Sequence, residues 1–145
     1  MDYLSIELPA LDGKTYKLSD FKDQKVILYF YPKDDTSGCT LEAKDFTALK
    51  NDFKDKGYQI IGVSRDSIKS HQKFTDKHDL NLLLLSDETE ELVKAFDVLK
   101  EKQMFGKTYM GIVRSTFILD EDGNVVEEYR NVKAKNHAEE LLKSL

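Results

Sequence analysis

Residues 26–46, VILYFYPKDDTSGCTLEAKDF, contain an apolar run, a polar turn and the chain's only cysteine, Cys39. Residues 26–31 are apolar and rich in β-branched and aromatic side chains, which predicts a central strand covered on both faces. Pro32 ends this strand. Apolar residues then recur at spacings of four, three, three and four from Cys39 to Phe53. This period predicts a helix that places Cys39 in its first turn.

The predicted position of Cys39 favours a reactive thiol. The first backbone N–H groups of a helix lack partners, and the helix dipole adds partial positive charge there. A thiolate at such a position, especially beside a cation, is stabilised and nucleophilic. A lone cysteine can also be an inert, small buried hydrophobe. The polar turn and the helix start favour the reactive interpretation.

The composition predicts one ordinary globular domain over residues 1–145, with 40% hydrophobic and 34% charged residues. The net charge of −5 offers no basic surface for nucleic acid. No apolar run approaches the ~20 residues of a membrane span, and the first residues resemble no leader. One cysteine suits a reducing compartment and excludes an internal disulfide. We therefore expect a cytoplasmic protein without membrane contact, metal or cofactor.

The first two thirds of the chain predict strands that alternate with helices. Residues 6–18 surround Asp12–Gly13, a dipeptide suited to a tight turn between two short strands. Residues 58–64 predict a strand parallel to the first, joined to it by a right-handed crossover. Ser67 can cap a helix that runs to about residue 80, and residues 82–85 predict a short strand.

The last third predicts a loop, a hairpin and a helix. Residues 99–111 lack clean periodicity and contain two glycines, which indicates a loop. Residues 112–119 predict a strand that Asp122–Gly123 turns into a second strand over residues 124–130. Residues 135–145 have a helical apolar pattern. The whole predicts an α/β fold whose central mixed sheet is flanked by helices, compatible with a thioredoxin-like fold.

Several polar residues outside the turn have structural explanations. His71 and His78 lie on one face of a predicted helix, but two turns apart, too far to chelate one ion unaided. We expect both to be partly buried with satisfied hydrogen bonds, and His137 to be solvated. Ser86 or Asp87 is expected to cap a helix whose first turn is acidic, where the dipole favours carboxylates.

The turn resembles the active-site signature of the peroxiredoxins. Pro32, Thr36 and Cys39 fit the pattern P-x-x-x-T-x-x-C, and YFYPKDDTSGCTLEA is similar to the Q-type, bacterioferritin-comigratory-protein-like branch. The resemblance continues through LDGKTYKLSDF, IIGVSRDSIKSHQKF, LLSDETEELVKAFDV and KTYMGIVRSTFILDEDG. It covers most of the chain in the expected order, and it implies a thioredoxin-like fold with an N-terminal β-hairpin extension.

The resemblance implies a thiol-dependent peroxidase that reduces hydrogen peroxide and organic hydroperoxides through a sulfenic acid at Cys39. In the family an arginine in the context R-x-T-F lies beside the cysteine, and Arg114 matches it. Backbone N–H groups of Gly38 and Cys39, the Thr36 hydroxyl and Arg114 would bind the peroxide, and Pro32 would shield the sulfur. By residue type alone, Arg114 would snorkel or pair with a carboxylate, Thr36 would stabilise the turn, and Pro32 would end the strand.

Two departures from the family pattern bear on the reaction cycle. Many Q-type members carry a resolving cysteine five residues after the first, where this chain has Lys44. An external thiol must then reduce the sulfenic acid: a thioredoxin, a glutaredoxin or a low-molecular-weight thiol. Ser37 replaces a proline, which removes a constraint on the loop. We leave Glu42 outside the catalytic set because its charge would oppose a thiolate, and we expect a monomer.

Three other functions have distinguishable consequences. A thiol-disulfide oxidoreductase needs a second cysteine at the position of Thr36, and would reduce insulin without turning over peroxide. A glutathione-peroxidase-like enzyme lacks its tryptophan here, since the chain has none. In a non-catalytic binding module, Cys39 would be alkylated slowly, and replacing Arg114 would not change that rate.

Overall fold

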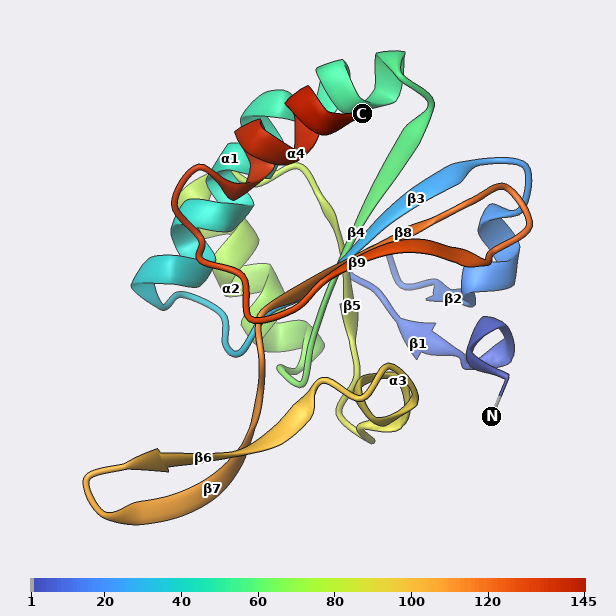
Figure 1. Ribbon diagram of the computed structural model, residues 1–145. Coiled ribbons are helices and arrows are strands. Elements are labelled where there is room, and N and C mark those ends of the chain that lie inside the picture. Colours follow the sequence, from blue (N-terminus) through green and yellow to red (C-terminus); the bar gives the residue numbers. More distant parts are fainter. Residues whose placement is uncertain (1) are drawn as a thin grey trace.

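A five-stranded mixed sheet forms the centre of the fold. The computed structural model describes residues 2–145. Three neighbouring strands are parallel, β8 is antiparallel to β3, and β9 is antiparallel to β8. In spatial order the strands are β5 (Leu83–Ser86), β4 (Tyr58–Ser64), β3 (Lys25–Phe30), β8 (Ser115–Leu119) and β9 (Val125–Tyr129) (Figure 1). This arrangement confirms the predicted α/β class and is that of a thioredoxin-like fold.

Strand β3 lies in the middle of the sheet, as its apolar sequence predicts. Residues 26–30 are each at most 2% exposed. Their side chains alternate between the two faces: Ile27 and Tyr29 join one apolar cluster, and Leu28 and Phe30 join the other. Burying a side chain of this size stabilises a fold by about 1.5–3 kcal/mol. The strand is therefore anchored on both faces, and the loop that follows it starts from a fixed point.

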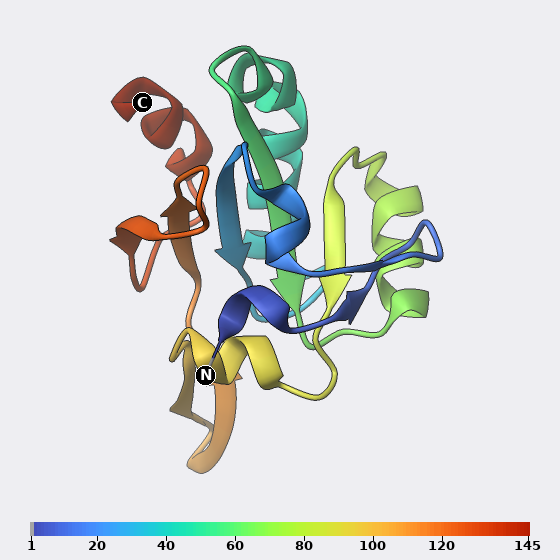
Figure 2. The same ribbon diagram turned by 90° about the vertical axis from the view of Figure 1, so that its right-hand side faces the viewer.

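Helices and short elements cover the two faces. The face that bears Tyr29 is covered by α1 (Ser37–Asp55), α2 (Ile68–His78) and α4 (His137–Ser144). The opposite face is covered by η1 (Tyr3–Ser5), β1 (Leu8–Pro9), β2 (Thr15–Tyr16), η2 (Leu18–Phe21) and α3 (Glu91–Ala95). Figures 1 and 2 show these two layers on either side of the sheet. Within residues 2–145, none of the helices has the length and apolarity needed to cross a bilayer.

Several local predictions are confirmed. Strands β1 and β2 form the predicted N-terminal hairpin, in which Leu8 pairs with Tyr16. Ser67 caps α2, because its side chain accepts a hydrogen bond from the N–H of Ser70 at 3.1 Å. The hairpin at Asp122–Gly123 joins β8 to β9.

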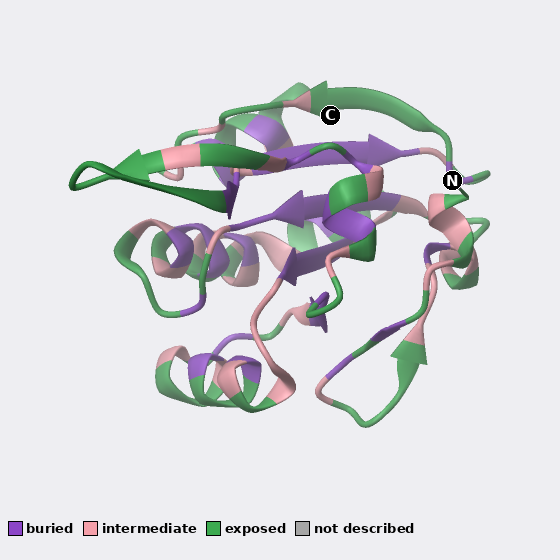
Figure 3. Ribbon diagram, turned by 90° about the horizontal axis from the view of Figure 1, so that it is seen from below, coloured by how far each residue is buried: buried purple, intermediate pink, exposed green. Residues whose placement is uncertain are grey.

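The expected loop over residues 99–111 is wrong. These residues form most of an antiparallel hairpin of β6 (Leu99–Met104) and β7 (Lys107–Ile112), which turns at Phe105 and Gly106, both at positive φ. The hairpin projects from the body of the molecule, and most of its residues are exposed (Figures 1 and 3). A strand pair exposed on both faces lacks the alternation of apolar and polar residues that identifies a half-buried strand.

Two further expectations need correction. The strand predicted over residues 112–119 is interrupted: β7 ends at Ile112, β8 begins at Ser115, and Arg114 lies in the break. Helix α3 begins later than expected, after Glu90 at φ +66°, so neither Ser86 nor Asp87 occupies its N-cap position. The Asp87 carboxylate still accepts a hydrogen bond from the N–H of Val93, in the first turn of α3, at 2.8 Å.

Candidate active site

The carboxyl end of β3 leads through a short turn into α1, which places Cys39 in the first helical turn as predicted. Thr36 is the N-cap residue, and the backbone bonds of the helix start with the N–H of Thr40 donating to Thr36 O at 2.8 Å. The N–H groups of Gly38 and Cys39 precede that bond. They therefore belong to the group of helix-start donors that lack helical acceptors.

Cys39 is buried but in contact with a cation. The residue is 1% exposed, and Arg114 Nη2 donates a hydrogen bond to its Sγ at 3.3 Å. The Arg114 side chain is itself largely buried, at 14% exposed. A permanent positive charge at this distance stabilises a thiolate relative to a thiol.

Glu42 holds the other side of the same guanidinium. Arg114 Nη1 donates to Glu42 Oε1 at 2.7 Å, and the Glu42 side chain is fully buried. Burial raises the pKa of Glu42 to about 7, although the charge of Arg114 and its hydrogen bond act to lower it. Among residues 2–145, the second oxygen, Oε2, has no hydrogen-bond partner. Glu42 thus positions Arg114 from outside the predicted catalytic set.

Gly38 allows the guanidinium to lie against the start of the helix. A Cβ atom at this position would be 3.0 Å from Arg114 Nη2, tighter than most real Cβ contacts.

Thr36 Oγ1 donates to Lys33 O at 2.9 Å, the turn-stabilising bond expected from its residue type. Pro32 is half-buried at the end of β3. The structure therefore brings Gly38, Cys39 and Arg114 together and gives Thr36 a bond within the turn.

The chain is similar to a family of known proteins over most of its length. The sequence profile of the AhpC/TSA family matches residues 2–128. The chain belongs to this peroxiredoxin family. Peroxiredoxin Bcp of Bacillus subtilis is 51% identical over 140 residues, which cover 97% of this chain and 89% of the relative.

Solved structures agree with the sequence relatives. Peroxiredoxin Q of Xanthomonas campestris has a TM-score of 0.93 and 44% identity, covering 98% of this chain and 90% of its own. A bacterioferritin comigratory protein of the same organism, studied for alkyl peroxide reduction, has a TM-score of 0.92, 44% identity and the same coverage. The resemblance to the Q-type branch is thereby confirmed. This peroxiredoxin is a thiol peroxidase, whose reaction takes a peroxide and a thiol.

His137 corrects a prediction about the surroundings of the peroxiredoxin site. The residue is 8% exposed rather than solvated, and its Nε2 lies 2.9 Å from the hydroxyl oxygen of Thr116 on β8. Burial, followed by the positive charge of Arg114, lowers the pKa of His137 to about 4. The imidazole is therefore neutral at pH 7 and adds no second positive charge beside Arg114.

Lys102 is a cation near the site that sequence reasoning missed. It comes from β6, and its Nζ donates to Ile112 O at 2.5 Å, two residues before Arg114. Burial and then repulsion from Arg114 lower its pKa, whereas the charge of Cys39 acts to raise it. The projecting hairpin thus contributes a lysine to the electrostatics of the peroxiredoxin site.

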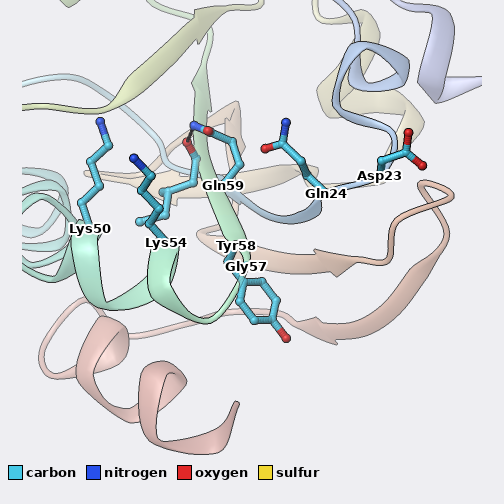
Figure 4. Close-up of a pocket in the computed structure, with 8 residues that line it drawn as sticks. Asp23, Gln24, Lys50, Lys54, Gly57, Tyr58 and Gln59 are labelled. Atoms are coloured by element: carbon cyan, nitrogen blue, oxygen red, sulfur yellow. Dashed lines mark hydrogen bonds between the residues drawn. The ribbon is translucent and has the colours of Figure 1, made fainter.

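A surface hollow elsewhere on this peroxiredoxin lies away from Cys39. It is found at the amino ends of β3 and β4, whereas Cys39 follows the carboxyl end of β3. Figure 4 shows seven of its lining residues labelled, with lysines from α1 on one side. The lining residues are Asp23, Gln24, Lys50, Lys54, Gly57, Tyr58, Gln59 and Ile60.

Proposed function

We propose that this peroxiredoxin reduces hydrogen peroxide and organic hydroperoxides through Cys39 alone. The Cys39 thiolate attacks one oxygen of the peroxide, the S–O bond forms, and the O–O bond breaks. The leaving oxygen takes a proton and departs as water or an alcohol, and the sulfur is left as a sulfenic acid. The observation that carries this proposal is the 3.3 Å contact between Arg114 Nη2 and Cys39 Sγ at a helix start.

The neighbouring groups have distinct roles in the proposal. Negative charge spreads over the sulfur and both oxygens in the transition state, so donors around the peroxide accelerate the step. Arg114 and the N–H groups of Gly38 and Cys39 supply these donors, with the Thr36 hydroxyl as a further one once it turns from Lys33 O. Pro32 limits the access of water to the sulfur.

An external thiol completes the proposed cycle. Cys39 is the chain's only cysteine, and Lys44 stands exposed on α1 where many Q-type members have a resolving cysteine. A thioredoxin, a glutaredoxin or a low-molecular-weight thiol must therefore attack the sulfenic acid and then resolve the mixed disulfide. A reducing compartment such as the cytoplasm would supply that thiol. We propose that the chain works as one domain and as a monomer.

Steady-state peroxide consumption tests the proposal. Purified protein is mixed with cumene hydroperoxide or hydrogen peroxide, and the remaining peroxide is measured with dithiothreitol, thioredoxin plus its reductase, or glutathione plus glutaredoxin. We expect turnover with at least one of these thiols and none in Cys39→Ser. Insulin reduction without peroxide turnover would instead identify a thiol-disulfide oxidoreductase.

A further inference from the structure

Two consecutive aspartates of the active-site turn face two histidines of α2. His71 Nδ1 lies 2.7 Å from Asp34 Oδ2, and His78 Nε2 lies 2.7 Å from Asp35 Oδ1. The two histidines are seven residues apart, too far to share one metal ion. Each instead contacts its own aspartate. Helix α2 therefore contacts the turn at two points, one near each end of the helix.

The buried contact between His71 and Asp34 has the geometry of an ion pair. The Asp34 carboxylate accepts from Tyr31 Oη at 2.6 Å and from Ser70 Oγ at 2.8 Å, in addition to its contact with His71. His71 Nε2 lies 3.0 Å from the carbonyl oxygen of Leu85, which can only accept. Both ring nitrogens thus face acceptors, and only an imidazolium can donate to both. Burial by itself lowers the pKa of His71, but the hydrogen bond and charge of Asp34 outweigh it, so the pKa is raised.

The backbone of the turn is also held at Asp34, by a hydrogen bond to Asp66. The N–H of Asp34 donates to Asp66 Oδ2 at 2.8 Å, and the same oxygen accepts from Ser64 Oγ at 2.6 Å. Asp34, Asp66 and His71 have possible ligand atoms within 4.8 Å of one another. Protein donors already occupy the carboxylate oxygens that meet there, so the group is explained by hydrogen bonding.

The exposed contact holds the second aspartate. Asp35 has φ +60°, in the left-handed region, and its carboxylate contacts Lys77 Nζ at 2.7 Å as well as His78. The hydrogen bond from His78, followed by that from Lys77, lowers the pKa of Asp35. These bonds favour the left-handed conformation, which is uncommon outside glycine.

The position of the turn sets the position of the helix start. Asp35 is followed directly by Thr36, the cap of α1, and Thr36 Oγ1 bonds back to Lys33 O. We propose that α2 clamps this turn, with Asp34, Asp35, His71 and His78 as positioning residues that align Thr36 and the first turn of α1 with Arg114. This inference rests on the proposed peroxidase function.

The clamp has a consequence that a purely structural role would lack. The cation in contact with Cys39 Sγ is Arg114, which comes from another part of the chain. Peroxide reduction also needs the donors of the turn and of the helix start. Loosening the clamp should therefore slow the peroxide reaction much more than alkylation by iodoacetamide, which needs a thiolate but no peroxide-binding donors.

The variants His71→Gln and Asp35→Asn test the two ends of the clamp. Lys73→Gln, at an exposed position of α2 that takes no part in the contacts described above, is the control. Stopped-flow mixing gives the second-order rate constant for hydrogen peroxide, and mass spectrometry gives that for iodoacetamide. A displacement near 1 Å can cost about a hundredfold. We expect roughly a tenfold to hundredfold loss with peroxide in His71→Gln, a smaller loss in Asp35→Asn, and less than about a threefold change in alkylation.

Several outcomes would overturn the clamp. Equal losses in both reactions would show general damage to the site, and unchanged peroxide rates would show that the contacts do not position it. If His71→Gln fails to fold, Asp35→Asn at the exposed end tests the clamp, again by comparing the loss in peroxide rate with the change in alkylation rate. A wild-type protein that is alkylated but inert to peroxide would instead reject the proposed function.

A spectroscopic measurement addresses the ion pair directly. We expect the ¹⁵N signals of His71 at pH 7 to show both ring nitrogens protonated, and Asp34→Asn to shift them toward the neutral form. A neutral imidazole in the wild-type protein would contradict the clamp at its buried end.

Discussion

Arg114 Nη2 lies 3.3 Å from Cys39 Sγ, although 75 residues separate the two in sequence. The contact exists because β8 pairs antiparallel with β3, which brings the break before β8 beside the turn after β3. The guanidinium also bonds Glu42 on the next turn of α1. One cation is thus shared between a sulfur and a buried carboxyl group.

Replacing Arg114 by Ala should show whether Cys39 is a reactive cysteine or an inert one. Loss of a donor to a developing charge typically costs about 100-fold to 1000-fold in rate, and we expect a loss of that order in peroxide reduction. Alkylation of Cys39 by iodoacetamide at pH 7 should slow as well. Arg130→Lys, at an arginine bonded to backbone carbonyls of Phe96 and Asp97, is the control. Alkylation that is slow in the wild type and unchanged in Arg114→Ala would support the binding-module alternative.

Glu42 should make stability fall as the pH rises. Its pKa in the folded protein is raised by burial to about 7, from an ordinary value of 4.5. The folded state therefore holds the proton more tightly, and this contribution is fully present below pH 4.5 and is lost as the pH rises through about 7. Urea unfolding midpoints at pH 5, 6, 7 and 8 should fall less steeply in Glu42→Gln than in the wild type. Parallel pH profiles of the two proteins would contradict a raised pKa of Glu42 in the folded state.

His137 should make stability fall as the pH falls, opposite to the effect of Glu42. Its pKa is lowered to about 4 by burial and then by Arg114, from an ordinary value of 6.5. Its contribution to stability is therefore present above pH 6.5 and is lost as the pH falls through about 4. In an NMR titration, the ring protons of His137 should not shift between pH 7 and pH 5.5. A midpoint near pH 6.5 would mean that the ring is solvated.

Gly38→Ala should displace Arg114 without removing any charge. The added Cβ would lie 3.0 Å from Arg114 Nη2, so the guanidinium must shift away from the helix start. We expect roughly a tenfold loss in the peroxide rate constant, with a change in unfolding midpoint no larger than that of the control Ser37→Ala, at the exposed neighbouring position. A rate equal to that of Ser37→Ala would show that the guanidinium tolerates the shift.

Sequence patterns identified the elements whose burial is one-sided or complete. The apolar run of β3 and the four-three spacing along α1 predicted both elements and placed Cys39 in the first helical turn. The hairpin of β6 and β7 was missed because both of its faces are largely exposed, so its residues follow no apolar period. The position of Cys39 could be predicted because the apolar patterns of β3 and α1 are both local in sequence.

The contacts between distant segments could not be read from local pattern. The pairing of Arg114 with Cys39 was expected only through the family resemblance, because nothing near either residue indicates the other. His137 was misjudged because its partner, Thr116, lies on a strand 21 residues earlier. The link between His71 and Asp34 was missed for the same reason, since it spans 37 residues.

Intact-mass analysis after one equivalent of hydrogen peroxide tests the role of Cys39 most directly. Reduced protein is mixed with the peroxide at neutral pH, quenched within seconds, and measured with and without a sulfenic-acid trapping reagent. We expect rapid gain of one oxygen at Cys39, capture by the reagent, and no such gain in Cys39→Ser. A wild-type protein that keeps its original mass, or that gains the oxygen equally in Cys39→Ser, would contradict this role of Cys39.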